Sequence, residues 1–138
     1  RVISEDSAAQ VSSMLEEVVK VGTGERWNLP GYSVAAKTGT SRLVAETQVD
    51  AEDAYTWADG GFHYVAAFTG YLPAERPQVS ITVILEDTTN GLTGSTAAGP
   101  VFSDLARLSI RELGIAPSHP AETDAASRAG DGSGRVQR

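Results

Sequence analysis

The sequence has 138 residues and no cysteine, which allows one domain or part of a larger one and excludes disulfide scaffolds and thiolate chemistry. Eighteen acidic residues against eleven basic ones give a formal net charge of -7. A nucleic-acid-binding protein needs a basic face to offset phosphate charge, so we expect no nucleic-acid partner. The longest apolar run, Tyr64 to Phe68, is far too short to cross a bilayer. Because the chain opens on Arg1 without a signal-like segment, we expect it to be an internal piece of a longer protein.

The predicted elements, in chain order, are a helix at 4–22, strands at 32–40, 62–72 and 79–86, and a final helix led by Gly99-Pro100. In both helices apolar residues recur at helical spacing. Ser4 or Asp6 can cap the first helix and Gly22 can end it. The last two strands are joined by LPAERPQ, a short connection that suits antiparallel neighbours.

Two segments do not fit regular elements. The connection 41–61 is long, and after Arg42 its charged residues are all acidic. It is either a solvated acidic excursion or the wall of a cleft in which Tyr55 and Trp57 touch a ligand. Residues 116–138 are rich in small and polar residues and contain one large aliphatic side chain, so we expect 1–115 to form the domain and 116–138 a disordered tail.

The segment Lys37-Thr38-Gly39-Thr40 carries the most chemical information. Side chains alternate along a strand, so Lys37 and Gly39 should point to one face, Thr38 and Thr40 to the other. The lysine supplies a cation, the two hydroxyls can hydrogen-bond one carboxylate, and the glycine leaves room beside the lysine. If the strand lies at a sheet edge, its free backbone groups can also pair with an extended peptide. Together these residues predict a site for a peptide that ends in an anion.

The surrounding sequence resembles a known family. In order, the chain contains VVKVGTG at the end of a helix, LPGYSVAAKTGTS, FTGYLPAERP, an aliphatic strand, and AAGPVF at the start of a helix. This arrangement, over residues 1–113, resembles the C-terminal end of the transpeptidase domain of class B penicillin-binding proteins, in which K-T-G is one of three active-site motifs. The resemblance implies an α+β fold: a fragment of the β-lactamase/transpeptidase-like fold, with antiparallel strands flanked by an N-terminal and a C-terminal helix.

The resemblance also implies roles for four residues. Lys37 is similar to the lysine that lines the groove beside the catalytic serine and sustains a positive field there. Thr38 and Thr40 are similar to the hydroxyls that bind the terminal carboxylate of D-alanyl-D-alanine or of a β-lactam. The backbone N–H of Thr40 resembles the strand donor of the oxyanion hole, and Gly39 leaves space for substrate.

The family's other two motifs, S-x-x-K and S-x-N, do not occur in this sequence. The resemblance therefore implies that the nucleophilic serine lies upstream, and we expect this chain alone to be inactive. The resemblance implies that this chain is part of a peptidoglycan D,D-transpeptidase, which cross-links stem peptides through an acyl-serine, and that it supplies the KTGT strand. Two alternatives remain: a β-lactamase-like hydrolase or penicillin sensor, and, from another class, a non-catalytic module that binds penicillin or peptide.

The resemblance further implies partners and a location. The partners are stem peptides, β-lactams, the upstream part of the same domain and cell-wall synthesis proteins. The location is the extracytoplasmic face of a bacterial cell membrane, with the anchor upstream. We expect no cofactor and no metal, because no spacing of His, Asp and Glu supports a metal site.

Other candidates for chemistry are weaker. His63 has no serine or acid partner identifiable from the sequence, so a hydrogen-bonded structural histidine is favoured. The acidic pairs Glu16-Glu17 and Glu86-Asp87 should diverge rather than act together. Trp27 is expected to anchor the core rather than to stack on a ligand.

Overall fold

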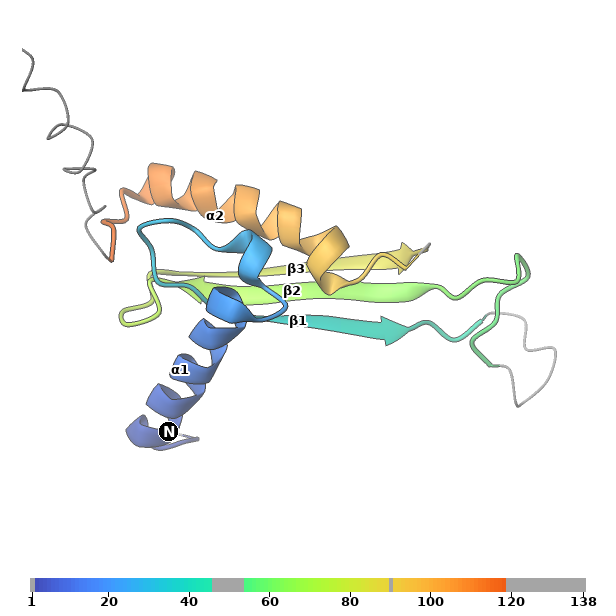
Figure 1. The fold of residues 1–138 in the computed structure, drawn as a ribbon, viewed down its shortest axis with the longest axis horizontal. Helices are drawn as coiled ribbons and strands as arrows, with labels where there is room; N and C mark the ends of the chain where they lie inside the picture. Colours follow the sequence, from blue (N-terminus) through green and yellow to red (C-terminus); the bar gives the residue numbers. More distant parts are fainter. Residues whose placement is uncertain (1, 46–53, 90, 119–138) are drawn as a thin grey trace, which may run out of the picture.

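A computed structural model of the protein describes residues 2–45, 54–89 and 91–118. The elements, in chain order, are α1 (Glu5–Val21), the 3-10 helix η1 (Glu25–Trp27), β1 (Ala35–Arg42), β2 (Tyr64–Leu72), β3 (Val79–Thr88), the π-helix η3 (Gly94–Ala98) and α2 (Gly99–Leu113). This order confirms the predicted α+β class, with strands between two long helices (Figure 1). Among these described residues, no helix has the length and apolar character that a membrane span requires.

Local sequence signals set the ends of both long helices. The Ser4 hydroxyl accepts a hydrogen bond from the N–H of Ser7 at 3.1 Å, which satisfies a donor in the first turn of α1. Pro100 lies in the first turn of α2, where its missing N–H has no helical partner to lose. Gly114 ends α2 with φ 61, a left-handed conformation that glycine adopts without strain.

The three strands form one antiparallel sheet in the order β1-β2-β3. The register pairs Lys37 of β1 with Thr69 of β2, and Thr69 in turn with Thr82 of β3. β1 is therefore an edge strand, since no strand in the described part of the chain pairs with its outer side. Peptide binding along this strand was predicted on the condition that the strand lies at the edge of a sheet, and β1 does.

The strand ends differ from the predicted ones by a few residues. β1 runs from Ala35 to Arg42 instead of 32–40, and β3 runs to Thr88 rather than to residue 86. Tyr32 is not part of β1 because its N–H closes a turn onto the Leu29 carbonyl at 3.0 Å and its hydroxyl donates to the Ile115 carbonyl at 3.1 Å. β2 also begins later than predicted, at residue 64 instead of 62.

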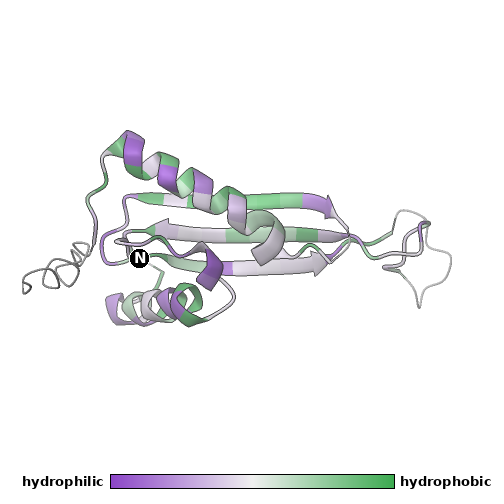
Figure 2. Cartoon of the chain, turned by 45° about the horizontal axis from the view of Figure 1, so that its top comes forward, coloured by the Kyte–Doolittle hydropathy of each residue, from purple (hydrophilic) through white to green (hydrophobic). Residues whose placement is uncertain are grey.

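The core lies between one face of the sheet and α2. Figures 1 and 2 show α2 lying across the sheet, whereas α1 lies beside β1. The rings of Phe68 in β2 and Phe102 in α2 are both fully buried, and their centroids are 4.6 Å apart. Gly70 makes room for Phe102, because a Cβ on Gly70 would lie 2.9 Å from the ring and 2.7 Å from the Cβ of Ala36. This packing holds the inner strand β2 and the adjoining start of β1 against α2.

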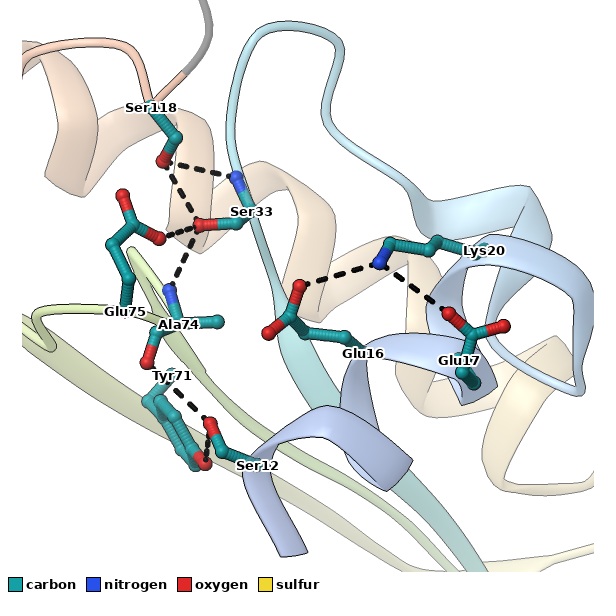
Figure 3. Close-up of polar contacts among 9 residues, drawn as sticks. All are labelled: Ser12, Glu16, Glu17, Lys20, Ser33, Tyr71, Ala74, Glu75 and Ser118. Carbon is teal, nitrogen blue, oxygen red and sulfur yellow. Dashed lines mark hydrogen bonds and ion pairs between the residues drawn. The ribbon is translucent and has the colours of Figure 1, made fainter. Parts of the chain in front are cut away.

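A set of hydroxyl contacts closes the end of the sheet where β1 begins. The Ser33 hydroxyl accepts a hydrogen bond from the N–H of Ala74 at 3.1 Å and contacts Glu75, as Figure 3 shows. The Ser118 hydroxyl accepts from the Ser33 N–H at 3.1 Å, which ties the segment after α2 to the entry of β1. The tail predicted for 116–138 lies outside the described residues from 119 onward and stays a prediction.

Phe102→Ala should lower the free energy of unfolding by about 3–5 kcal/mol, because it removes a fully buried ring and leaves a cavity beside Phe68. The measurement is urea unfolding of the complete protein that contains this chain. Leu113→Ala is the control: this leucine is in the same helix and 61% exposed, so its loss should cost less than about 1 kcal/mol. Equal losses in the two variants would contradict the assignment of the core.

Candidate active site

The KTGT segment occupies the exposed part of β1. Ala35 and Ala36, the first two residues of the strand, are buried. From Lys37 onward every residue of the strand is exposed except Thr38, which is partly buried. The chain therefore emerges from the core at the lysine, and the next residues lie at an open edge of the sheet.

The register of β1 decides which backbone groups are free at this edge. Just beyond the strand, the N–H of Leu43 donates to the His63 carbonyl at 2.8 Å, so Leu43 points its backbone groups at the β2 side. Backbone direction alternates along an antiparallel pair, and the register is unbroken from residue 42 back to residue 35. Lys37 and Gly39 therefore also point toward β2. The N–H and C=O groups of Thr38 and Thr40 point away from it, toward the open side.

The side chains of the segment alternate as the sequence predicts. A Cβ on Gly39 would contact only the Ala67 side chain, at 3.5 Å, so the lysine face of the strand is open at this point. On the same edge, the Lys37 ammonium donates to the Thr38 carbonyl at 2.9 Å and lies 3.4 Å from the Thr38 hydroxyl. The Lys37 side chain therefore reaches the open edge of β1, where its charge lies next to the outward-pointing Thr38 carbonyl.

The two threonine hydroxyls meet residues that the sequence analysis did not identify. The Thr38 hydroxyl lies 3.1 Å from that of Thr23, which follows α1. The Thr40 hydroxyl accepts a hydrogen bond from the N–H of Gly94 at 3.0 Å, at the start of η3. These contacts join positions 15 and 54 residues apart, and no local spacing rule predicts such pairs.

This arrangement is suited to an anion carried by an extended chain. One ammonium and two hydroxyls lie along an edge whose outward N–H and C=O groups can pair with a peptide. Within the described ranges, no group of three or more His, Cys, Asp or Glu side chains is placed to hold a metal ion. Together, the ammonium, the hydroxyls and the outward backbone groups of β1 can bind and polarise an anionic peptide.

The acidic residues Glu16 and Glu17 of α1 form ion pairs with Lys20. The Lys20 ammonium lies 3.4 Å from a carboxylate oxygen of Glu16 and 3.4 Å from one of Glu17 (Figure 3). These contacts raise the pKa of Lys20, chiefly through the hydrogen bond to Glu17. Glu17 is exposed and Glu16 is partly buried, and neither lies at the edge of β1 formed by Lys37 to Thr40.

His63 has the acid partners that could not be identified from the sequence. Its Nδ1 contacts the carboxylate of Asp87 at the end of β3, and its Nε2 lies 3.1 Å from that of Asp59. Trp57 stacks on the imidazole, with ring centroids 4.2 Å apart, and its Nε1 points to the Leu43 carbonyl at 3.4 Å. One face of Trp57 is thus covered from within the chain, which favours a structural role over a ligand contact, and the interpretation of His63 as structural is supported.

The connection 41–61 has some structure of its own. Thr56 forms a β-bridge with Phe62, and the N–H of Ala45 donates to the Ala54 carbonyl at 2.9 Å. Tyr55 is 44% exposed. Of its acidic residues, those in 46–53 lie outside the described residues, so whether this connection lines a cleft stays open.

His63 should titrate above its ordinary pKa of 6.5, because hydrogen bonds to Asp87 and then Asp59 raise it. The Gly61 N–H and His63 lower the pKa of Asp59 below its ordinary 3.8. The histidine's stabilisation is complete below pH 6.5 and is lost as the pH rises through its raised value. The stabilisation from Asp59 is present above pH 3.8 and is lost as the pH falls through the lowered pKa of its carboxyl group.

Proton NMR titration of the complete protein measures this shift. Asp87→Asn should bring the pKa of His63 down toward 6.5, since it removes the carboxylate whose hydrogen bond raises that pKa most. Asparagine suits the left-handed backbone at this position, where φ is 62, so the variant changes the charge with little strain. A His63 pKa at or below 6.5 in the unmodified protein would contradict the arrangement.

Comparison with known proteins extends these observations. The family model "Penicillin binding protein transpeptidase domain" matches residues 1–107. A probable peptidoglycan D,D-transpeptidase PenA of Neisseria flavescens is 35% identical over 123 residues, which cover 87% of this chain and 28% of that protein. The apo transpeptidase domain of Burkholderia pseudomallei penicillin-binding protein 3 has 33% identity and a TM-score of 0.67, covering 87% of this chain and 34% of that one.

A further solved structure carries a ligand. Penicillin-binding protein 3 of Mycobacterium tuberculosis, complexed with ampicillin, has 26% identity and a TM-score of 0.65, covering 88% of this chain and 27% of that one. The chain thus spans about a third or less of the length of these relatives. Because the family model matches more than half of its residues, the chain belongs to the penicillin-binding protein transpeptidase domain family.

Proposed function

We propose that this chain is the C-terminal part of a serine-type D,D-transpeptidase domain and that it supplies the strand along which the substrate lies. The substrate is a peptidoglycan stem peptide that ends in D-alanyl-D-alanine, and β-lactams occupy the same place. One observation carries the proposal: Lys37 to Thr40 form the exposed part of an edge strand, with the backbone groups of Thr38 and Thr40 facing outward.

The substrate's carboxylate is held by the two hydroxyls of this edge. Thr38 and Thr40 share one face of the strand, two residues apart, so a ligand along the edge passes both. The Lys37 ammonium lies beside Thr38 and adds a positive charge that attracts the anion. A hydrogen bond to a charged group contributes about 1.5–3 kcal/mol, so each hydroxyl is a substantial part of the binding.

The backbone of Thr40 takes part in the reaction. Its N–H points away from β2. In the proposed reaction it donates to the carbonyl oxygen that becomes negative during attack. One donor of this kind is typically worth about 10²–10³ in rate. The nucleophile is a serine of the upstream S-x-x-K motif. It displaces D-alanine to form an acyl-serine, which the amine of a neighbouring stem peptide then resolves.

The surfaces left open on this chain fit a place inside a larger domain. In the described part of the chain, no strand pairs with the outer side of β3. Ile84 in that strand is 59% exposed and Met14 in α1 is 66% exposed. We propose that the upstream part of the domain covers these surfaces. The complete protein acts at the extracytoplasmic face of the membrane with other cell-wall synthesis proteins, and this chain alone is inactive.

A fluorescent penicillin should label the complete protein covalently. The label should survive denaturing electrophoresis, because acylation forms an ester with the serine. Replacement of the S-x-x-K serine by alanine is the control and should abolish the label. A complete protein that is folded but takes no label would overturn the proposed function.

Thr40→Val should slow acylation by a carboxylate-bearing β-lactam by about 10- to 100-fold, the equivalent of one hydrogen bond to a charged group. Thr40→Ser keeps the hydroxyl and should retain most of the rate. Thr82→Val makes the same change on an exposed residue of β3 in the same sheet and should leave the rate within about twofold. The rate of acylation is measured by stopped-flow. An unchanged rate in Thr40→Val would show that the Thr40 hydroxyl does not bind the carboxylate.

A further inference from the structure

Gly94 lies closer to the backbone of β1 at Lys37 to Thr40 than a residue with a side chain could. A Cβ at this position would lie 2.4 Å from the Gly39 carbonyl oxygen and 2.3 Å from that of Ala67. Real Cβ atoms do not approach backbone atoms to these distances, so only glycine fits without moving a strand. The start of η3 therefore rests directly on the Gly39–Ala67 pair that joins β1 to β2.

The N–H of Gly94 is available to the strand because of where it lies in its helix. The first N–H groups of a helix have no partner within the helix. At η3, a reciprocal pair of hydrogen bonds between Thr93 and Thr96 caps the turn without using the N–H of Gly94. This N–H donates instead to the hydroxyl oxygen of Thr40, at 3.0 Å.

Two further contacts hold the start of η3 in place. The indole N–H of Trp27 donates to the Ser95 carbonyl at 2.8 Å, and the Ser95 hydroxyl donates to the Thr23 carbonyl at 2.7 Å. Thr23 in turn lies against the hydroxyl of Thr38. The turn after α1 and the first turn of η3 thus form one connected support beneath both threonines of the segment.

The hydrogen bond from Gly94 determines how the Thr40 hydroxyl can act. A hydroxyl has one hydrogen to donate and lone pairs to accept. With a lone pair occupied by Gly94, the hydrogen of Thr40 points elsewhere. Among the residues that the structure describes, no hydrogen bond donated by the Thr40 hydroxyl is found. The side chain is exposed at the open edge, so the hydrogen is free for a ligand.

We propose that Gly94 is a positioning residue that presents the Thr40 hydroxyl as a hydrogen-bond donor to the ligand's carboxylate. The inference rests on the proposed function and adds to it a residue outside the KTGT segment. A carboxylate and an ester both accept hydrogen bonds, but the bond to the ionised carboxylate is about twice as strong. A Thr40 hydroxyl that is oriented as a donor therefore favours an anion over a neutral ester at the same place. Gly94 acts through Thr40 and does not touch the ligand itself.

The test compares acylation by a β-lactam carboxylate with acylation by its methyl ester, using the complete protein. Gly94→Ala should lower the preference for the carboxylate by about tenfold, because it displaces the donor from Thr40. The matched control is Gly70→Ala, which also forces a Cβ into close contact, 2.7 Å from the Ala36 Cβ and 2.9 Å from the Ala35 carbonyl oxygen. Gly70→Ala should lower stability but leave the preference within about twofold.

A double-variant cycle shows whether Gly94 acts through Thr40. In the Thr40→Val background, Gly94→Ala should cause no further loss of preference, since the hydroxyl that it orients is absent. If Gly94→Ala does not fold, replacement of the Thr93–Gly94 amide by an ester removes the N–H without adding a Cβ and should lower the preference in the same direction.

The outcomes separate this inference from the proposed function. An unmodified protein that is not acylated at all overturns both. An unmodified protein that prefers the carboxylate, together with a folded Gly94→Ala variant of unchanged preference, overturns the positioning role alone. Equal loss of preference in Gly94→Ala and Gly70→Ala, or additive losses with Thr40→Val, also overturns it, because the effect would then be general disturbance of the sheet.

Discussion

The register between β1 and β2 is the constraint on which the site depends. Because Leu43 donates to the His63 carbonyl, every second residue back along β1 turns its backbone toward β2. Within Lys37 to Thr40, Thr38 and Thr40 are the residues left facing outward. A slip of one residue would turn their N–H and C=O groups inward and move their hydroxyls to the opposite face. The buried pair Ala35 and Ala36 prevents such a slip, since it would bring Lys37 into the core.

The rest of the fold supports this strand from the core and leaves its outer edge open at Lys37 to Thr40. On the face toward the core, the packing of Phe102 on Phe68 fixes α2, and η3 extends from α2 to rest on Gly39 and Ala67. On the opposite face little lies against Gly39. A rigid support behind a strand and free backbone groups at its edge are what a preorganised binding site requires. Under the proposed function, the upstream part of the domain supplies the other side of the binding site.

Local signals in the sequence predicted most of the fold and singled out Lys37 to Thr40, the segment on which the proposed function rests. Helical periodicity with Ser4 and Gly22 defined α1, and Gly99-Pro100 marked the start of α2. The contacts of the site were not predictable in this way. Gly94 meets Thr40 across 54 residues and Asp87 meets His63 across 24, distances at which only the folded chain determines the neighbours. Tyr32 was wrongly placed in β1 because its hydrogen bonds to Leu29 and Ile115, which keep it out, are equally invisible in a local pattern.

The most direct test of the account is a crystal structure of the complete protein acylated by a carboxylate-bearing β-lactam. We expect the ligand along the outer edge of β1, with its carboxylate within about 2.7–3.2 Å of the Thr38 and Thr40 hydroxyls and its carbonyl oxygen facing the N–H of Thr40. A ligand whose carboxylate lies away from both hydroxyls, or a β1 edge covered by another strand, would contradict the account.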